Sequence, residues 1–491
     1  MSHSTRHKRR RSRSNDRFDT QMIANGVLLI LFALLAGIAS YTMYAHNILA
    51  FRHVNVIYTA VLVVVFLVCL LLTLFKKGKH LVTVLLVLFS IVVGVSLFAF
   101  KSLVDVADNI NKTASYSEIE MKVVVPANSS ISDVSELTNV QAPTSADESN
   151  INALIANIKS EKGVELTVDP VDSYQSAYEN LINGNSQAMV LNSSYSSLLE
   201  LSYNDYESNL KTIYTYKIKK AIEDTAKTTD KNVFNIYISG IDTSGAVSTV
   251  SRSDVNLILT VNMNTHKILM TTTPRDSYVR IPDGGADQYD KLTHAGIYGI
   301  ETSVKTLENL YDIPINYYAR LNFTSFVKLI NALGGVTVYN DQAFTSLYGN
   351  YNFGVGNINL TSGEEALGFV RERYSLEHGD YDRGNNQLKV IQAIVEKLTS
   401  FQSVSNYSDV ISTLQDSIQT NMPLNTMMSL VNEQLDSGKT FIFSSQEVTG
   451  TGSTGQLTSY AMPNASLYMI QLDDASVAKA SQAIKNVMEG K

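Results

Sequence analysis

The chain has 491 residues, of which 45% are hydrophobic and 17% are charged, and its formal net charge is -7. This length predicts two or three domains, and a mean hydropathy of +0.00, high for a soluble protein, argues against a purely cytosolic enzyme. The single cysteine, Cys69, excludes intramolecular disulfides, cysteine-based zinc sites and iron–sulfur clusters.

The N-terminal residues form a basic tail. Residues 1–17 contain seven lysines and arginines and one aspartate, a net charge of +6, which leaves -13 for the rest of the chain. An acidic body disfavours nucleic acid as its main partner. The tail is too short to fold into a reader of base sequence, so DNA contact by the tail is disfavoured as well.

Three stretches without any aspartate, glutamate, lysine or arginine follow the tail: Met22–Tyr44, Val54–Phe75 and Leu81–Phe100. Each is near the ~20 residues that a helix needs to cross the hydrocarbon core of a bilayer. Positive charge flanks them in the tail and in the Lys76–Lys79 loop, whereas the loop between the first two spans carries Arg52 alone. Because cationic loops stay on the cytoplasmic side, we predict a multi-pass protein of the cell membrane, with a cytoplasmic N-terminus and an extracellular region after Phe100.

Changes in composition and periodicity divide the chain. The predicted parts are a basic cytoplasmic tail (1–21), three transmembrane helices (22–100), a polar connector (101–118), a small α/β accessory domain (119–216), a charged helical linker (217–230) and a larger α/β domain (231–491). The accessory domain alternates predicted strands and helices, at Met121–Val125, Glu148–Ser160, Val164–Val168, Tyr174–Asn183 and Ala188–Leu191. It contains no convergent charges, which favours binding or positioning over catalysis.

The larger domain begins with strands and continues with amphipathic helices. Val233–Ser239 is a predicted strand, and Val255–Val261 with Ile268–Thr273 forms a predicted hairpin. Apolar residues at helical spacing predict helices at Thr302–Leu310, Phe323–Leu333 and Asn385–Ser400. Alternating strands and helices favour a mixed central sheet with helices on its faces.

Charged residues converge at one end of the predicted hairpin. Asp254 precedes its first strand and Arg275 follows its second, and antiparallel pairing returns these two positions to the same end of the sheet. Asp242 follows the Val233–Ser239 strand closely, and Arg252 lies two residues before Asp254. We therefore expect these four side chains to lie together.

Two further pairs occur later in the chain. Arg371 and Arg373 are separated by two residues, which places them on one face of a predicted extended segment. Arg383 and Gln387 are separated by four, which places them on one face at the start of a predicted helix. The free amides of that helix N-terminus favour an anion.

Together these residues give five arginines and two aspartates, a net charge of +3 in an otherwise acidic domain. Arginine forks onto phosphate oxygens with two parallel hydrogen bonds, and aspartates among arginines suit a hard divalent cation such as Mg²⁺. The alternative is that Arg371 and Arg373 form ion pairs with neighbouring acids at Glu364, Glu365, Glu372 and Glu377. Nearby, Lys291 is a candidate for the same anion, whereas His294 is expected to be structural or a rim contact.

The motifs that carry these residues resemble those of LytR–CpsA–Psr proteins. Residues 238–245 (ISGIDTSG), 251–259 (SRSDVNLIL) and 272–279 (TTPRDSYV) resemble the first motifs of the family, and residues 363–373 (GEEALGFVRER) and 380–387 (DYDRGNNQ) resemble the later ones. Five blocks in the family's order cover about 231–491, and the three spans with an intervening domain resemble the capsule-locus members. Residues 384–386 depart from the pattern, since many members carry a second arginine there.

The resemblance implies transfer of a capsular or related glycopolymer from an undecaprenyl-pyrophosphate carrier to peptidoglycan outside the cell, by phosphotransfer that leaves a phosphodiester link. It implies a catalytic set of Asp242, Asp254, Arg275, Arg371 and Arg373, with Mg²⁺ (or Mn²⁺) held by Asp242 and Asp254. It places the pyrophosphate among Arg252, Arg275, Arg371, Arg373, Arg383 and Gln387. An apolar tunnel between sheet and helices would hold the prenyl chain.

Other functions stay open at this point. One is a non-catalytic assembly factor that binds polyprenyl pyrophosphate, and another is a regulator of capsule expression. The expected partners are the lipid-linked polysaccharide, peptidoglycan and membrane lipid, with other capsule-assembly membrane proteins as further candidates. Which aspartate accepts a proton also stays open.

The unequal positive charge of the segments that flank the three spans leads to a test of topology. A reporter that works only outside the cell should be active when fused after Phe100 and inactive in the Lys76–Lys79 loop, because the positive flanks stay inside. A reporter that works only in the cytoplasm should give the opposite pattern. Activity of the outside reporter in the lysine loop would contradict the orientation.

Overall fold

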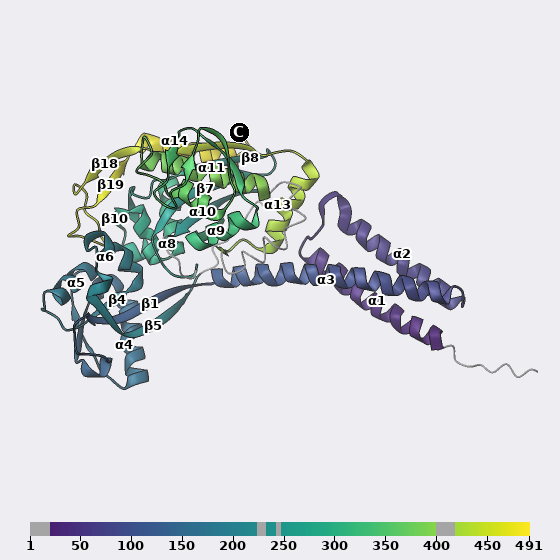
Figure 1. Cartoon of the computed structure of the whole chain (residues 1–491), viewed down its shortest axis with the longest axis horizontal. Helices are drawn as coiled ribbons and strands as arrows, with labels where there is room; N and C mark the ends of the chain where they lie inside the picture. Colours follow the sequence, from purple (N-terminus) through teal and green to yellow (C-terminus); the bar gives the residue numbers. More distant parts are fainter. Residues whose placement is uncertain (1–19, 223–231, 242–246, 399–417) are drawn as a thin grey trace, which may run out of the picture. The chain divides into compact units, whose positions relative to one another are not determined.

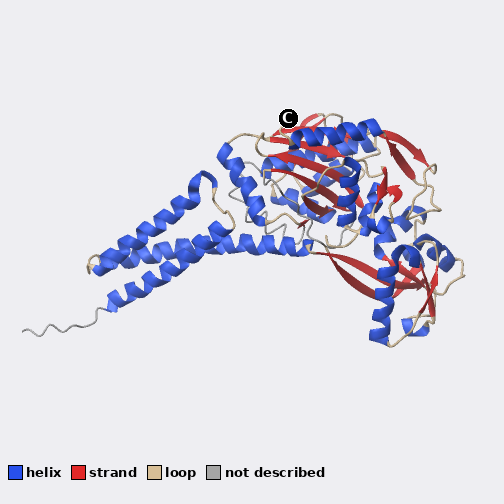
Figure 2. Cartoon of the chain, turned by 180° about the vertical axis from the view of Figure 1, so that it is seen from behind, coloured by secondary structure: helices blue, strands red, loops and turns tan. Residues whose placement is uncertain are grey.

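A computed structural model describes residues 20–222, 232–241, 247–398 and 418–491. The chain divides into two compact units, one ending at Ser102 and one beginning at Leu103. Figure 1 labels the helices and strands along the chain, and Figure 2 distinguishes helices, strands and loops by colour.

The first unit contains three helices that are long and apolar enough to cross a membrane: α1 (Thr20–Ala45), α2 (Val54–Leu74) and the greater part of α3 (Lys79–Ala114). Phe32, Cys69 and Leu86 are buried between these helices, while Ile30 and Val64 point outward. A bundle that exposes apolar side chains on its outside is typical of a membrane environment. The three predicted helices are present, each long and apolar enough to cross a membrane.

The polar connector expected at 101–118 is a helix over most of its length. α3 continues without a break to Ala114, and strand β1 (Tyr116–Pro126) begins two residues later. Val106, Ala107 and Ile110 are buried, at the spacing of one face of a helix. The charged residues between them made this segment look like a loop in the sequence.

The accessory domain is built on a five-stranded sheet with the order β3-β2-β4-β1-β5. Its elements are β1, β2 (Asn139–Ala142), α4 (Thr144–Lys162), β3 (Thr167–Pro170), α5 (Tyr174–Ile182), β4 (Met189–Asn192), α6 (Ser196–Ser202) and β5 (Leu210–Ala221). The predicted helices and strands of this domain are present, with shifts of a few residues at their ends. The short strand β2 and the strand β5 lie outside the predicted elements.

The predicted charged helical linker at 217–230 is wrong in its first part. Lys217–Ala221 continues β5 and pairs with β1, so that Lys217 lies opposite Glu120 and Lys219 opposite Glu118. Apolar residues and lysine alternate over residues 216–219, and opposite charges across neighbouring strands stabilise the pairing. The accessory domain therefore extends to Ala221, and residues 223–231 lie outside the described residues.

The C-terminal domain has a six-stranded central sheet with the order β16-β11-β6-β7-β8-β17. Its strands are β6 (Val233–Ile241), β7 (Ser253–Asn262), β8 (Lys267–Thr272), β11 (Tyr317–Asn322), β16 (Ile418–Thr420) and β17 (Ile442–Glu447). β7 runs antiparallel to both of its neighbours, β6 and β8, whereas β11 runs parallel to β6 and β17 runs parallel to β8. The predicted hairpin and mixed sheet are confirmed.

Helices cover both faces of this sheet (Figure 2). On one face, α8 (Ile300–Tyr311) and α14 (Asp474–Met488) contribute to a cluster that includes Ile258. On the other, α11 (Asp380–Leu398) and α13 (Leu424–Ser437) pack with Leu257 and Leu259. Because β7 is buried on both sides, apolar side chains occupy the consecutive positions 257–259 instead of alternating with polar ones.

Smaller elements complete the domain. α9 (Phe323–Ala332) and α10 (Gly363–Arg371) pack with α11 in a further apolar cluster. The remaining elements are β9 (Tyr278–Ile281), β10 (Gln288–Lys291), α7 (Leu292–Ala295), β12 (Val336–Asn340), β13 (Phe344–Thr345), β14 (Asn352–Phe353), β15 (Gly356–Leu360), β18 (Gly450–Thr454) and β19 (Tyr468–Leu472).

The accessory and C-terminal domains share a core. Tyr195 and Leu198 of the accessory domain lie in one apolar cluster with Ile297 and Met469 of the C-terminal domain. Both domains belong to one compact unit.

Backbone hydrogen bonds join the same two domains near residue 250. The Glu118 N–H of β1 donates to Ser248 O (2.9 Å), and the Val250 N–H donates to Glu118 O (3.1 Å). The accessory domain therefore holds the backbone that leads into β7.

Candidate functional site

The end of the β7–β8 hairpin carries an ion pair. Arg275 Nη1 lies 2.6 Å from Asp254 Oδ2, and Thr293 Oγ1 donates to Asp254 Oδ1 (3.2 Å). The sequence prediction that antiparallel pairing brings Asp254 and Arg275 together is confirmed. Asp242, expected beside them, lies outside the described residues.

A β-bulge places Asp254 in the site. Gly240 of β6 pairs with Val255, but the next residue, Ile241, pairs with Ser253, so Asp254 is an extra residue in β7. A bulge changes the direction in which the following side chains point. As a result, the neighbouring residues Asp254 and Val255 both line the same cavity, whereas alternating strand geometry would send them to opposite faces.

Arg320 of β11 supports the backbone on the other side of this bulge. Its guanidinium donates to Val247 O (3.1 Å) and Thr249 O (2.9 Å), and the residue is only 2% exposed. Burial lowers the pKa of Arg320 to about 10, so the group is still charged at neutral pH. Because Arg252 follows this held segment and lines the cavity, Arg320 positions Arg252 from behind.

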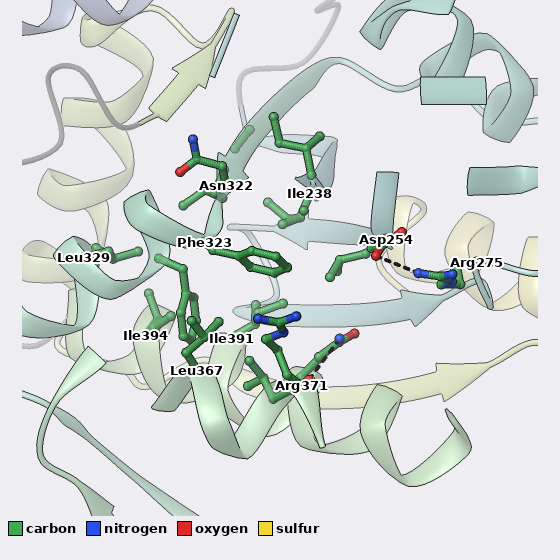
Figure 3. Close-up of a pocket in the computed structure, with 18 of the residues that line it drawn as sticks. Ile238, Asp254, Arg275, Asn322, Phe323, Leu329, Leu367, Arg371, Ile391 and Ile394 are labelled. Atoms are coloured by element: carbon green, nitrogen blue, oxygen red, sulfur yellow. Dashed lines mark hydrogen bonds and ion pairs between the residues drawn. The ribbon is translucent and has the colours of Figure 1, made fainter. Parts of the chain in front are cut away.

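A cavity of about 520 Å³ opens beside the hairpin end, between the central sheet and α9, α10 and α11. Aliphatic and aromatic side chains form most of its wall (Figure 3), including Ile238, Phe323, Leu329, Leu367, Ile391 and Ile394. Its polar lining consists of Arg252, Asp254, Arg275, Asn322, Arg371, Arg383 and Gln387. In Figure 3, Asp254 and Arg275 lie at one end, Arg371 beside Phe323, and Leu329 with Ile394 at the other.

Arg383 and Gln387 lie in the first turns of α11, as their spacing predicts. Both line the cavity, and Gln387 Nε2 donates to Val370 O of α10 (3.3 Å). They also border a smaller polar recess of about 20 Å³ with Asp254 and Arg275, where Glu447 of β17 is a further acidic neighbour. The sequence had no signal for Glu447, because strand β17 was not predicted.

The extended segment predicted for Arg371 and Arg373 is wrong. Arg371 is the last residue of α10, which Ser362 caps by accepting the N–H of Glu365. The apolar residues Ala366, Leu367 and Val370 hold this helix against the core. The two arginines therefore differ in position: Arg371 lines the cavity, and Arg373, beyond the end of the helix, is not among the described residues that line it.

Aromatic rings position the Arg371 guanidinium. Its Cζ lies 4.4 Å from the ring centroid of Phe323 and 5.2 Å from that of Tyr348, distances at which a cation and a ring attract. Tyr348 is fixed in turn because its hydroxyl donates to Glu364 Oε2 (2.6 Å). Tyr348 is distant in sequence and was not predicted from the sequence.

Three of the four acids considered as ion-pair partners of these arginines bind other groups. Glu364 binds Tyr348, and Glu365 accepts the N–H and hydroxyl of Thr361 (2.8 and 3.0 Å). Glu372 accepts three backbone N–H groups, from Leu347 (2.6 Å), Arg373 and Ser375 (2.9 Å each). These bonds favour the cavity interpretation of Arg371 over the ion-pair alternative.

Glu372 is buried, with 3% of the residue exposed. Burial alone would raise its pKa, but the N–H groups of Ser375, Leu347 and Arg373 outweigh burial, so the pKa of Glu372 is lower than that of an ordinary glutamate. Its ionised form thus joins the loop around Leu347 to the loop after α10.

His294 and Lys291 serve structure. His294 is fully buried, with Nδ1 2.9 Å from Asp290 Oδ1, which confirms the structural expectation. Lys291 Nζ lies 2.6 Å from Asp276 Oδ1 with both groups buried, and Lys291 does not line the described cavity.

The carboxylates of the described residues fit a magnesium ion only at a site to which substrate phosphate groups also contribute oxygen ligands. Across 20–222, 232–241, 247–398 and 418–491, no group of three or more histidine, cysteine, aspartate or glutamate side chains is arranged to hold a metal. Asp254 supplies one carboxylate at the arginine end of the cavity. Mg²⁺ binds through one or two carboxylates together with substrate phosphates, so Asp254 is compatible with it.

The lowered pKa of Glu372 predicts a pH effect. The group's contribution to local stability is complete above the pKa of an unfolded glutamate, about 4.3, and is lost as the pH falls through its lower folded value. Amide hydrogen exchange on the full chain should therefore show protection of Leu347 and Ser375 at neutral pH that declines below about pH 4. Glu372→Gln should remove the pH dependence, whereas Glu365→Gln should leave it unchanged. Equal pH dependence in wild type and Glu372→Gln would contradict this role.

Comparison with known proteins gives relatives for the C-terminal region. Residues 200–476 match the LytR_cpsA_psr family. Residues 76–191, less than a quarter of the chain, also match the DNA polymerase processivity factor family, over a stretch that begins before α3 and ends in β4.

Individual relatives agree with the first match. The chain is 33% identical over 282 residues to the polyisoprenyl-teichoic acid–peptidoglycan teichoic acid transferase TagU of Enterococcus faecalis, covering 56% of this chain and 87% of that one. It is 35% identical over 232 residues to TagU of Oceanobacillus iheyensis, covering 46% and 69%. The crystal structure of B. subtilis TagU is 28% identical, with a TM-score of 0.42 and coverage of 53% of this chain and 98% of that chain. The chain belongs to the LytR–CpsA–Psr family.

Proposed function

We propose that the protein transfers a glycopolymer from a polyprenyl-pyrophosphate carrier to peptidoglycan. The observation that carries this proposal is the continuity of the cavity, which joins a wall of aliphatic side chains to a cluster of arginines. An amphiphile with an apolar chain and an anionic head matches both parts at once. Relatives named polyisoprenyl-teichoic acid–peptidoglycan transferases support the same class of donor and acceptor.

A finer proposal concerns the polymer and the place of reaction. We infer that the polymer is capsular or a related cell-wall glycan, because the three predicted spans followed by an intervening domain resemble the capsule-locus members of the family. The reaction takes place outside the cell. This follows from the positive charge of the tail and of the Lys76–Lys79 loop, which favours a cytoplasmic position for both segments. The three apolar helices are consistent with a membrane-anchored protein.

In the proposed reaction, a hydroxyl of peptidoglycan attacks the phosphorus that bears the glycan. The new bond joins the hydroxyl oxygen to that phosphorus, and the bond to the bridging oxygen breaks, which releases prenyl phosphate and leaves a phosphodiester. Arg252, Arg275, Arg371 and Arg383 neutralise the charge on the pyrophosphate oxygens, and Gln387 donates to them. Positioning and charge neutralisation account for most of the catalysis of phosphoryl transfer.

The aspartates have two roles in this proposal. Asp254, held by Arg275 and Thr293, and Asp242 would hold Mg²⁺, and one of them accepts the proton of the attacking hydroxyl. When bound, the ion adds positive charge next to the leaving phosphate. Mn²⁺ prefers the same carboxylate and phosphate oxygens.

Substitution of Arg371 tests the anion site. Each hydrogen bond to a charged group contributes about 1.5–3 kcal/mol, so Arg371→Ala should weaken the binding of undecaprenyl pyrophosphate roughly ten- to a hundredfold. Arg373→Ala should weaken it less, because Arg373 lies beyond the described cavity wall. The matched control is Arg280→Ala, which removes an exposed arginine of β9.

Titration calorimetry of the full chain in detergent would measure these affinities, and release of prenyl phosphate from a lipid-linked oligosaccharide would measure transfer. An Arg371→Ala variant that binds the lipid as tightly as the wild type would give this arginine a structural role. Tight binding of the lipid-linked oligosaccharide without any turnover would favour the assembly-factor alternative.

Metal dependence tests Asp254. Because the proposed site is shared with pyrophosphate, Mg²⁺ should bind weakly alone and more tightly when undecaprenyl pyrophosphate is present. Asp254→Asn keeps the shape and removes the charge, so metal-dependent transfer should be lost while the arginines retain lipid. Calorimetric titration of Mg²⁺ with and without lipid checks this expectation. Equal Mg²⁺ affinity in both cases, or full activity of the variant, would remove Asp254 from the mechanism.

A further inference from the structure

The stretch of chain that leads into β7 has no regular structure beside the cavity. Residues 250–252 belong to no helix or strand, and Arg252, at the end of this stretch, is buried and lines the cavity. A strand is fixed by its ladder of backbone hydrogen bonds, whereas an irregular stretch is held by the groups that pack around it. The surroundings of residues 248–252 therefore decide where the Arg252 guanidinium lies.

One residue of this segment is inserted into the accessory domain. The Val250 side chain is 2% exposed and lies in one apolar cluster with Ile119, Leu154 and Val190. Every other described member of that cluster belongs to the accessory domain. Val250 therefore completes the core of a neighbouring domain from a position only two residues before Arg252.

The backbone around Val250 is bound by the same domain. Glu118 of β1 donates its N–H to Ser248 O (2.9 Å) and accepts the N–H of Val250 (3.1 Å), and it forms a parallel bridge with Thr249. These bonds fix the position of the backbone, and the buried side chain fixes its rotation. With both fixed at Val250, the direction in which the chain continues to Arg252 is set.

The C-terminal domain holds the same segment from another side. Arg320 donates to Val247 O and Thr249 O, which belong to residues five and three positions before Arg252. Val250 is nearer to Arg252 along the chain than either of them. The accessory domain thus makes the closer of the two sets of contacts.

The accessory domain also supports the next residue of the segment, Ser251. Gly296, in the short 3-10 helix η6 (Gly296–Tyr298), approaches so closely that a Cβ atom there would be 2.5 Å from Ser251 O. Its neighbour Ile297 packs with α6 of the accessory domain in one apolar cluster. The same helix α6 reaches the cavity, because Leu201 is among the residues that line it.

We propose that the accessory domain positions Arg252 for the pyrophosphate and that Val250 is the positioning residue, an inference that rests on the proposed function. Hydrogen bonds weaken steeply as their length and angle depart from the optimum, so a displaced arginine binds an anion less tightly. The family match begins at residue 200, after strands β1 to β4. This support is therefore an addition to the part of the chain that matches the family.

The test compares two valine substitutions in the same core. Val250→Ala and Val140→Ala each remove two methyl groups from the apolar cluster, and both residues are at most 2% exposed. Val140 lies in β2, which β4 separates from β1 in the sheet. Both variants should lower the thermal stability of the full chain to a similar extent. Val250→Ala should in addition weaken the binding of undecaprenyl pyrophosphate about three- to tenfold, because displacement of Arg252 loses only part of its charged hydrogen bonds, whereas Val140→Ala should leave this affinity unchanged.

A double substitution shows whether the effect passes through Arg252. Arg252→Ala should weaken lipid binding roughly ten- to a hundredfold. Adding Val250→Ala to it should cause no further loss, because no guanidinium is then left to position. Titration calorimetry of the full chain in detergent would measure the affinities of the wild type and of all four variants.

Other outcomes contradict the inference. If Val140→Ala weakens binding as much as Val250→Ala, the cause is the lower stability of the accessory domain and not the position of Arg252. An equal effect of Val250→Ala with and without Arg252 would mean that it acts by another route, and an Arg252→Ala variant that binds as the wild type does would remove this arginine from the anion site. If the wild type does not bind the lipid, the proposed function fails and the inference with it. If Arg252→Ala weakens binding but Val250→Ala does not, the inference fails alone.

Discussion

The ion pair between Asp254 and Arg275 is the constraint around which the site is arranged. It joins Asp254, the second residue of β7, to Arg275, which lies three residues after the end of β8, at a distance of 2.6 Å. Arg275 Nε also lies 3.6 Å from Asp276 Oδ1, but its shorter contact, with Asp254, crosses the hairpin. The hairpin must therefore form in one register for this pair to exist. The same register carries Arg252 to the cavity wall. Fold and charge placement are therefore the result of one set of backbone hydrogen bonds.

Around this pair, the domain combines two environments that would ordinarily be kept apart. The central sheet is covered on both faces, yet the packing between β6, β7 and the helices α9, α10 and α11 leaves a cavity with an aliphatic wall. Four arginines at one border compensate for the loss of water that an anionic head would suffer there. The site is suited to a molecule that is itself divided into an apolar and an anionic part, which neither a purely polar nor a purely apolar pocket would hold.

Local patterns in the sequence were sufficient for the parts that depend on neighbouring residues. The three long apolar helices follow from uninterrupted apolar runs, and the meeting of Asp254 with Arg275 follows from hairpin geometry. Errors arose where a pattern was short or tertiary packing decided the outcome. Lys217–Ala221 combines charge with a period of two and is a strand, and Arg371 ends a helix that the core stabilises. Arg320 and Tyr348 were missed, and Glu372 was considered only as an ion-pair partner, because the groups that they contact are distant in sequence.

The β-bulge at Asp254 has a consequence for how members of this family can diverge. A substitution in β7 changes one side chain, but removal of a single residue near the bulge would restore regular alternation and turn the carboxylate away from the cavity. The Arg252 side chain would change direction as well. The hydrogen bonds of Glu118 with the backbone of Ser248 and Val250, and of Arg320 with that of Val247, would fall on different residues. Chain length between Val247 and Val255 should thus be far less free to vary than residue identity, and insertions or deletions should accumulate in loops remote from this strand.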